Sequence, residues 1–472
     1  MPKLSRVPVT IADVVAVARA GERVTLSSVA ERDLSASRAI VEAVLADRVP
    51  VYGLNTELGA GRDIVVSAER LEEFQRRTLR NSSGGIGPAL SDEQTRALIF
   101  TRLVGFTRGG AGVTPALAHA YLAMLNDGPL PYVPRTGSVG AADLTHLAAV
   151  ASAVSHVFQP HEALAALSGN SFSVGVGALV LDELARVVTT SDLVVALSVS
   201  ALRAHSTGGS ASPFSEPVQR AHPAVGQAAS AARIRAALAD AEVGSVQDPV
   251  SFRSAPQVNG ALADAVSAAA AVVTLELNAR SENPLVDLES GSMVSGGNFQ
   301  ALSLALAYEQ LRLALAHVAV TSERRLSKLS ALGATARRAG ETRVPGLLWY
   351  SGAALVSELR HLANPVTLAA PTLSEGVEDH SSNAAVALQL LERSVALTRS
   401  VLAIEAVSAV ELLGLVDGPA LAPRTAELVV SIESLLGAGT PAHELLPRAE
   451  ELLEAAATPP VVSGVQPLDD EI

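Results

Sequence analysis

Apolar residues recur at helical spacing along most of the chain, which is therefore predicted to be almost entirely helical. Four stretches in its middle run for about 20 residues or more, beyond the usual mean of about 11–12 residues per helix. These stretches are Gly175–Ala204, Val258–Asn278, Phe299–Leu332 and Glu378–Leu413. Helices of this length bury their apolar faces best against one another, so the pattern predicts an all-α fold with a central bundle of long helices.

Shorter helical patterns, separated by glycine-rich loops, precede the long stretches. The predicted short helices begin near Thr10 and then cover Ser35–Ala46, Ala68–Leu79, Ser91–Gly105, Pro115–Asn126 and Leu144–Val157. The segments Val51–Gly61 and Asn81–Gly87 are predicted as loops, because glycine is unfavourable inside a helix. A third break, rich in glycine, serine and proline, spans Ser206–Pro217.

These patterns divide the chain into three regions. We expect residues 1–175 to form an N-terminal domain of helices and loops, and residues 176–415 to form the central bundle. Residues 416–472 are expected to form short helices that end in a frayed acidic tail at Pro459–Ile472.

The composition restricts the possible partners. Of the 472 residues, 49% are hydrophobic but only 3% are aromatic, and the abundance of alanine and leucine favours helices. A net charge of −13 argues against nucleic acid, which requires a clustered basic surface. The chain has no cysteine, which excludes disulfides and thiolate metal sites, and no bound metal is expected.

The expected location is the cytoplasm. The N-terminal segment lacks the apolar core of a signal peptide. Apolar runs such as Ala261–Leu277 are interrupted by charged residues, here Asp264 and Glu276, so no membrane span is predicted.

Several separated motifs resemble a single enzyme family. They are Tyr52-Gly-Leu-Asn-Thr, Val246-Gln-Asp-Pro-Val-Ser-Phe-Arg-Ser-Ala-Pro-Gln-Val-Asn-Gly260, Glu282-Asn-Pro-Leu-Val, Ser295-Gly-Gly-Asn-Phe-Gln300, Ser322-Glu-Arg-Arg325 and Glu378-Asp-His380. Each is weak alone, but together and in this order they resemble the aromatic amino acid and histidine ammonia-lyases over roughly residues 50–415. The resemblance implies the all-α fold of that family.

One loop departs from the family pattern at its chemical centre. The segment Thr136–Leu147 resembles the family's Gly-Ser-Val-Gly-Ala-Ser-Gly-Asp-Leu loop, whose Ala-Ser-Gly triplet cyclises into the electrophile methylidene-imidazolone. Here Ala141 is followed by Ala142 and then by Asp143, so the serine and the glycine are missing and the loop is one residue short. We therefore expect no imidazolone and no other cofactor.

Other family positions are also replaced. The family's second tyrosine falls on Val250, and the histidine of its Ser-His-Ala loop falls on Ser82. The asparagine that supports the prosthetic group in the family falls on Ser168, two residues before Asn170.

Tyr52 and Glu378 are the predicted catalytic residues. The resemblance gives Tyr52 an acid/base role on a mobile loop, although a phenol with a solution pKa near 10 requires a nearby cation or helix dipole to act as a base. The alternative is a tyrosine that merely packs within its loop. Glu378 is expected to be a base or a polar substrate contact, and the alternative is an ordinary glutamate on a helix surface.

The predicted substrate-binding residues are Arg253, Gln247, Ser82, Ser168, Asn170, Asn298 and Phe299. Arg253 offers a planar fork that binds a carboxylate, and its alternative is an intramolecular salt bridge. Gln247 and Asn298 can donate to a substrate carbonyl, although such residues as often cap the backbone. Phe299 is expected to form part of the pocket wall.

The predicted activity follows from the missing electrophile. Loss of ammonia from an amino acid requires activation of a poor leaving group, and one hydrogen-bond donor contributes only about a hundred- to a thousandfold. We therefore expect a lyase or cyclase of specialised metabolism that performs elimination, conjugate addition or isomerisation by acid/base chemistry on a small carboxylate- or carbonyl-bearing substrate. The alternatives are a catalytically silent homologue that binds a ligand or partner and, third, a true ammonia-lyase.

A homotetramer is the expected assembly. The resemblance implies that the long helices are shared between copies and that each site contains residues from three subunits. Helices such as Phe299–Leu332 also carry more apolar surface than one subunit is expected to cover.

Overall fold

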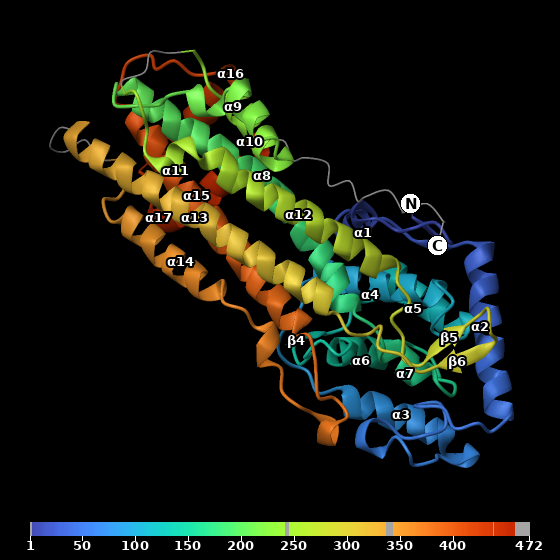
Figure 1. The fold of residues 1–472 in the computed structure, drawn as a ribbon. Coiled ribbons are helices and arrows are strands. Elements are labelled where there is room, and N and C mark those ends of the chain that lie inside the picture. Colours follow the sequence, from blue (N-terminus) through green and yellow to red (C-terminus); the bar gives the residue numbers. More distant parts are fainter. Residues whose placement is uncertain (1, 241–244, 337–342, 438, 458–472) are drawn as a thin grey trace.

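Long helices form the centre of the molecule (Figure 1). The computed structural model describes residues 2–240, 245–336, 343–437 and 439–457. The bundle consists of α8 (Ser171–Ala204), α12 (Ala255–Asn278), α13 (Leu302–Ala336), α14 (Leu348–Leu362) and α15 (Ala384–Leu413). Nearly every residue of α8 is buried, as expected of a mostly apolar helix that lies in the middle of a bundle. The predicted all-α fold is confirmed.

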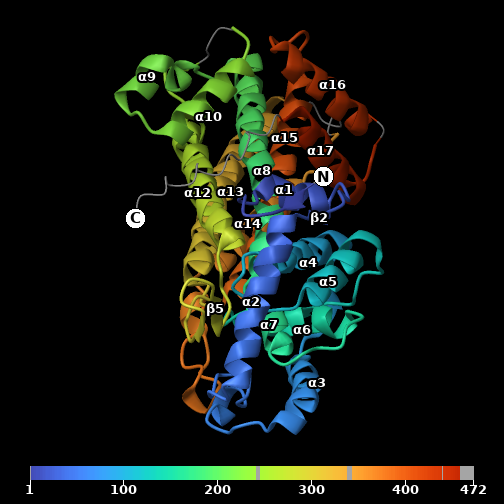
Figure 2. The same cartoon turned by 90° about the vertical axis from the view of Figure 1, so that its right-hand side faces the viewer.

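Shorter helices and loops form the N-terminal part, at one side and one end of the bundle (Figures 1 and 2). They are α1 (Ile11–Ala18), α2 (Ser28–Ala46), η1 (Gly59–Gly61), η2 (Ala68–Arg70), α3 (Leu71–Ser82), α4 (Asp92–Thr107), α5 (Pro115–Asp127), α6 (Leu144–Ala153) and α7 (Glu162–Leu167). Capping residues in the sequence determine where several of these helices begin. Thr10 accepts a hydrogen bond from the amide of Asp13 while its own amide donates to the Asp13 carboxylate, a capping box that begins α1.

The remaining elements are small. The short strands pair two by two: β1 (Lys3–Leu4) with β2 (Thr25–Leu26) in parallel, and β3 (Ile86–Ala89) with β4 (Pro134–Thr136) and β5 (Leu285–Asp287) with β6 (Ser292–Val294) antiparallel. The other helices are η3 (Ser212–Phe214), α9 (Glu216–Ala221), α10 (Val225–Ala236), α11 (Val250–Arg253), η4 (Thr367–Ala369), η5 (Ser374–Gly376), α16 (Pro423–Gly437) and α17 (Ala442–Ala456).

Some predicted helix boundaries were wrong. Helix α2 begins at Ser28 instead of Ser35, because the side chain of Ser27 accepts a hydrogen bond from the amide of Ala30 and so caps the helix earlier. Glu378 does not lie on the last long helix: it precedes α15 in a loop, where it pairs with Leu373. Helices α9, α10 and α14 were not predicted, and the predicted tail Pro459–Ile472 lies outside the described residues.

A buried ion pair joins the long helices. Arg325 of α13 donates to both carboxylate oxygens of Glu405 of α15, at 2.6 and 2.9 Å, and both side chains are fully buried. Ser198 of α8 and Ser322 of α13 donate to the same carboxylate. Arg325 also donates to the carbonyl of Ser251 in α11 at 3.0 Å. Because every donor is directional, this cluster fixes how the three helices and α11 lie against one another.

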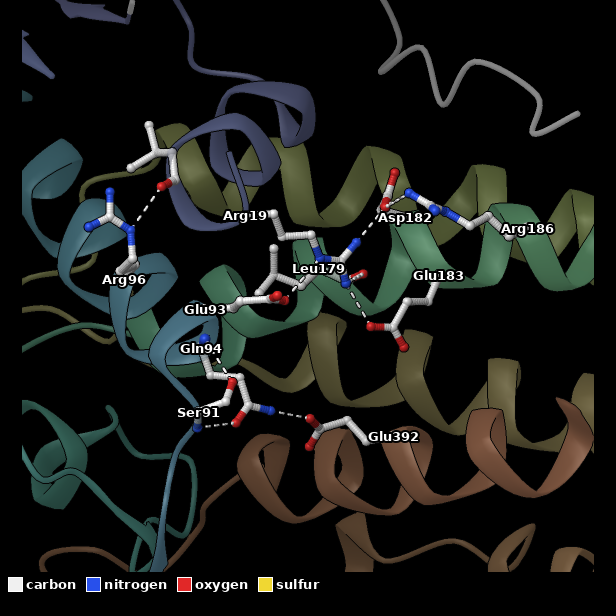
Figure 3. Close-up of polar contacts among 11 residues, drawn as sticks. Arg19, Ser91, Glu93, Gln94, Arg96, Leu179, Asp182, Glu183, Arg186 and Glu392 are labelled. Atoms are coloured by element: carbon white, nitrogen blue, oxygen red, sulfur yellow. Dashed lines mark hydrogen bonds and ion pairs between the residues drawn. The ribbon is translucent and has the colours of Figure 1, made fainter. Parts of the chain in front are cut away.

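A second polar network attaches the N-terminal helices to the bundle (Figure 3). Arg19, at the end of α1, donates to Asp182 and Glu183 of α8 at 2.5 and 2.6 Å. Gln94 of α4 donates to Glu392 of α15. The two contacts lie side by side and connect separate parts of the sequence.

Two segments are long and apolar enough to cross a membrane by length and composition alone, Glu162–Ala204 and Ala255–Asn278. The apolar window of the first is entirely buried among the other helices, and that of the second is 44% buried. Core helices of soluble proteins have the same properties, so these segments are weak evidence for a membrane span.

Candidate functional site

A cavity of about 410 Å³ lies at the end of the bundle where the N-terminal loops meet the segment before α15. Its lining residues are Tyr52, Arg62, Asp63, Ala141, Ala142, Leu144, Leu164, Ser168, Asn283, Ser295, Phe299, Val377 and Glu378. It brings together both residues predicted to be catalytic, Tyr52 and Glu378, with the loop that contains Ala141 and Ala142. The size and the mixture of apolar walls with a few polar groups are those of a small-molecule site.

Internal hydrogen bonds hold the loop that carries Tyr52. The side chain of Asn55 accepts from the amide of Val51 at 2.7 Å and donates to the carbonyl of Val49 at 2.8 Å. Gly53 has a φ of +66°, and a Cβ there would lie 2.2 Å from the side chain of Leu164. This position therefore requires glycine, and the Tyr-Gly-x-Asn sequence explains the shape of the turn.

The surroundings of Tyr52 keep its phenol neutral. Burial raises its pKa above the usual value, and the negative charge of Glu378 acts in the same direction. A hydrogen bond from the amide of Gly59 and the positive charge of Arg62 oppose this rise. Within one copy of the chain, Arg62 is thus the cation that favours the charged form of Tyr52.

Backbone hydrogen bonds also hold the loop at Ala141 and Ala142. Ala142 adopts the left-handed conformation, with a φ of +60°. Its amide donates to the carbonyl of Phe299 at 3.3 Å, and its carbonyl accepts from the hydroxyl of Ser138 at 3.2 Å. The next amide, that of Asp143, donates to the carbonyl of Gly169 at 2.8 Å.

Asp143 lies buried beneath this loop and is not among the residues that line the cavity. Its carboxylate accepts from the amide and the hydroxyl of Ser173 at 2.8 and 3.0 Å, and from the hydroxyl of Ser138 at 3.1 Å. It immediately precedes α6 and contacts the first turn of α8, so two helix N-termini surround one carboxylate. Burial nevertheless raises its pKa, while His146 and the hydrogen bonds oppose that rise.

The other predicted binding residues have different positions. Ser168 lines the cavity, where its hydroxyl accepts from the amide of Asn283 at 2.8 Å, and Phe299 forms part of the wall. Asn170 is buried at the start of α8, and neither atom of its amide has a hydrogen-bond partner among the described residues. Asn298 is exposed and donates to the carbonyl of Arg280 at 3.2 Å. Ser82 ends α3 outside the cavity lining.

Arg253 and Gln247 line a different cavity, of about 430 Å³. With its amide oxygen turned towards the guanidinium, Gln247 accepts hydrogen bonds from Arg253, the shortest at 2.9 Å. Nearby, the carboxylate of Asp248 accepts from the amides of Gly209 and Ser210 at 2.9 and 2.7 Å.

The two cavities lie at opposite ends of the bundle. Helix α12 starts beside Arg253, and its 24 residues rise by about 36 Å towards the first cavity. Figure 1 shows α11 and α3 at opposite ends of the molecule. A single copy of the chain therefore does not bring Arg253 to Tyr52.

Several lining residues of the cavity were not predicted from the sequence. Arg62 and Asp63 form a charged pair immediately after the glycine-rich loop of Tyr52, ten and eleven residues beyond it. Asn283 and Ser295 lie in the motifs quoted above but were not selected. The usable signal was a guanidinium directly after a loop already expected to lie near the site.

Comparison with known proteins establishes the relationship. The profile of the family described as "Aromatic amino acid lyase" matches residues 9–156 and 153–434. The chain belongs to this family. Histidine ammonia-lyase of Paracidovorax citrulli is 35% identical over 447 residues, with 87% of each chain covered. Histidine ammonia-lyase of Symbiobacterium thermophilum is 31% identical over 496 residues, with 97% of each covered.

Solved structures of family members have the same fold. Ergothionase of Treponema denticola, described as an ergothioneine-degrading enzyme in complex with desmethyl-ergothioneine sulfonic acid, superposes with a TM-score of 0.90. It is 26% identical, and the superposition covers 97% of this chain and 99% of that one. Histidine ammonia-lyase of Trypanosoma cruzi, at 24% identity, superposes with a TM-score of 0.83 over 96% and 93% of the two chains.

These relatives correct the predicted activity. Their names favour a working enzyme of the ammonia-lyase type over a cyclase, an isomerase or a silent homologue. The earlier expectation gave too much weight to one missing triplet. The missing triplet concerns activation of the leaving group alone, whereas Tyr52 and Glu378, the two predicted catalytic residues, still line one cavity.

Proposed function

We propose that this chain is a carbon–nitrogen lyase that releases an amine from the α-carbon of a small carboxylate bearing an imidazole ring. The observation that carries the proposal is the convergence of Tyr52 and Glu378 on one cavity beside Ala142. The names of the family members support the substrate class, because both histidine and ergothioneine contain an imidazole-derived ring.

The proposed reaction is a β-elimination. The phenol of Tyr52 first loses its proton to solvent, which the amide of Gly59 and the charge of Arg62 favour against the effect of burial. The resulting phenolate takes a proton from the β-carbon, and the electrons of that C–H bond form the α,β double bond. The electrons of the Cα–N bond leave with the amine, so the products are an imidazole acrylate and a free amine. Glu378 carries negative charge at the same cavity, where it attracts the cationic nitrogen of the substrate.

We further propose that no methylidene-imidazolone forms. The residues of the loop do not fit that group: Ala142 has no hydroxyl to lose, and Asp143 stands directly after it. The amide of Asp143 is also engaged with the carbonyl of Gly169, so it is not directed at the carbonyl of Ala141.

An enzyme without this electrophile requires a substrate whose nitrogen departs readily. A quaternary ammonium group leaves as a neutral tertiary amine, and its departure needs no electrophile to activate it. We therefore propose a trimethylammonium substrate. The ergothioneine-degrading family member supports this assignment, because ergothioneine carries that group.

We also propose that a homotetramer completes the site. Arg253 and Gln247 lie about one long helix away from Tyr52 in the same copy, so only a neighbouring copy can supply them. A closed assembly of identical copies repeats this contact at every site.

The test is amine release from matched substrates. The purified protein is incubated with histidine, with its Nα-trimethyl betaine and with ergothioneine, and the acrylate is followed by its ultraviolet absorbance. We expect trimethylamine and an acrylate from at least one of the two betaines. Ammonia from histidine would support the lyase but contradict the absence of imidazolone. No elimination from any of the three would contradict the proposed function.

A further inference from the structure

We infer that Arg62 holds the carboxylate of the substrate, from the same copy of the chain that supplies Tyr52. This inference rests on the proposed function, because it assumes that the substrate is an α-ammonio carboxylate. Arg62 would be a second guanidinium at the carboxylate, beside the Arg253 that a neighbouring copy contributes.

Arg62 is the only cation among the described residues that line this cavity. The same wall contains two carboxylates, Asp63 and Glu378. An anionic group that enters the cavity is repelled by these carboxylates unless it lies against Arg62. A zwitterionic substrate matches this arrangement, with its ammonium group towards Glu378 and its carboxylate towards Arg62.

The guanidinium of Arg62 still has donors to offer. Within the described residues, the guanidinium contacts one carboxylate, that of Asp63. The distance from Nε of Arg62 to Oδ2 of Asp63 is 3.9 Å, which is too long for a hydrogen bond. Its side chain is 50% exposed, so it can reach a bound ligand without leaving a buried partner. A planar fork with free donors is the side chain that binds a carboxylate bidentately.

The backbone around Arg62 is held in place relative to Tyr52. The amide of Arg62 donates to the carbonyl of Gly59 at 3.1 Å, and the amide of Gly59 donates to the hydroxyl of Tyr52 at 3.1 Å. The amide of Glu57 donates to the carbonyl of Ile64 at 2.9 Å and closes the loop behind them. The carboxylate contact and the base therefore belong to a single structural unit.

Binding of matched ligands separates a carboxylate contact from a general effect on folding. The probes are imidazole-4-acrylate and imidazole-4-acrylamide, which differ only in the anionic group, and affinity is measured by calorimetry with the intact assembly. We expect Arg62→Gln to weaken acrylate binding at least tenfold and to leave acrylamide binding unchanged. Arg62→Lys keeps the charge without the fork and should lose less affinity than Arg62→Gln.

Arg70→Gln is the control. Arg70 lies eight residues after Arg62 in the sequence, its side chain is 58% exposed, and it is absent from the cavity lining. This variant should bind both probes as the unchanged protein does. Equal acrylate affinity in Arg62→Gln and the unchanged protein, or no acrylate binding by the unchanged protein, would overturn the inference.

Different results would contradict the proposed reaction and the proposed contact of Arg62 with the carboxylate. Binding requires no turnover, so acrylate binding that depends on Arg62 together with no amine release would refute the reaction and leave the contact standing. Amine release that is unaffected by Arg62→Gln would refute the contact alone.

Discussion

The hydroxyl of Tyr52 accepts a hydrogen bond from the amide of Gly59 at 3.1 Å, which couples the proposed base to the glycine segment of its own loop. An amide donor stabilises a phenolate more than a phenol, because the interaction is stronger with the charged oxygen. The same bond therefore positions the ring and favours loss of its proton.

Tyr52→Phe should abolish turnover with little loss of affinity. The substitution keeps the ring and removes the group that exchanges the proton, so a reduction of kcat by about a hundredfold or more is expected. Tyr350→Phe, on the exposed face of α14, is the control and should retain full activity. Full activity in Tyr52→Phe would transfer the proton-moving role to another residue, and Glu378 would be the next to test.

The intact mass of the purified protein should equal the encoded mass, apart from removal of Met1. Formation of an imidazolone expels two waters, so the group is visible by mass spectrometry alone. A deficit of two waters would refute the proposal that none forms, and would also remove the reason for preferring a trimethylammonium substrate.

Mixed assemblies should recover activity that neither parent has. Tyr52→Phe removes the proposed base, and Arg253→Ala removes the guanidinium of the other cavity. In the proposed tetramer these two residues reach one site from different copies. Co-production of the two variants should leave about a quarter of the sites intact, by random mixing in a closed assembly. Mixing two preparations of Tyr52→Phe is the control. A stable monomer in light scattering, or no recovery, would contradict shared sites.

His161 should make the stability depend on pH. Burial, and then the charge of Arg38, lower its pKa to about 4, while its ring donates to the carbonyl of Ala111 at 3.1 Å. Between pH 6.5 and 4 the unfolded chain binds a proton that the folded chain does not, so stability falls as the pH falls, by about 3 kcal/mol in total.

The variant His161→Asn removes this titration. His161 has a φ of +79°, a conformation that asparagine tolerates better than most residues. Urea unfolding at several pH values should show a shallower loss of stability in the variant below pH 6.5. An identical pH dependence in both proteins would exclude His161 as the cause.

The pair Arg325–Glu405 should behave as one unit. Replacing either partner alone leaves the other charged and buried, at a cost of about 3–5 kcal/mol in the free energy of unfolding. The double variant Arg325→Met/Glu405→Leu should lose much less than the sum of the two single changes. The exposed pair Arg393–Glu358 is the matched control and should show almost no coupling. Additive effects at Arg325 and Glu405 would contradict the prediction.

Much of the fold could be predicted because the long helices repeat their apolar residues clearly. Boundaries were wrong where a single side chain decides them, as with the cap at Ser27. Glu378 was wrongly placed on the last long helix: residues 378–383 are all polar, and Asn383, with a φ of +53°, precedes the first helical residue of α15.

The site was only partly predictable. The motifs identified Tyr52, Ser168 and Phe299, which line one cavity, because these residues are tied to recognisable local sequences. Arg62 was missed, because its proposed role depends on lining the same cavity as Tyr52 and on the charges of the other lining residues. The separation of Arg253 from Tyr52 within one copy was not predicted either. The resemblance implies sites that are shared between copies, but the sequence does not say which copy supplies each residue.

Helix α8 sets the distance between the cavity of Tyr52 and the cavity of Arg253. It starts against Asp143, and its 34 residues extend for about 51 Å before Arg203 donates to the carbonyl of Gly209, whose amide is bound by Asp248. Inserting one residue in α8 would rotate the rest of the helix and the elements packed on it by about 100°, and would displace one cavity relative to the other. Changes of length are therefore expected in the connecting loops and not in α8, and in the proposed tetramer the separation of the two cavities is set by a single helix.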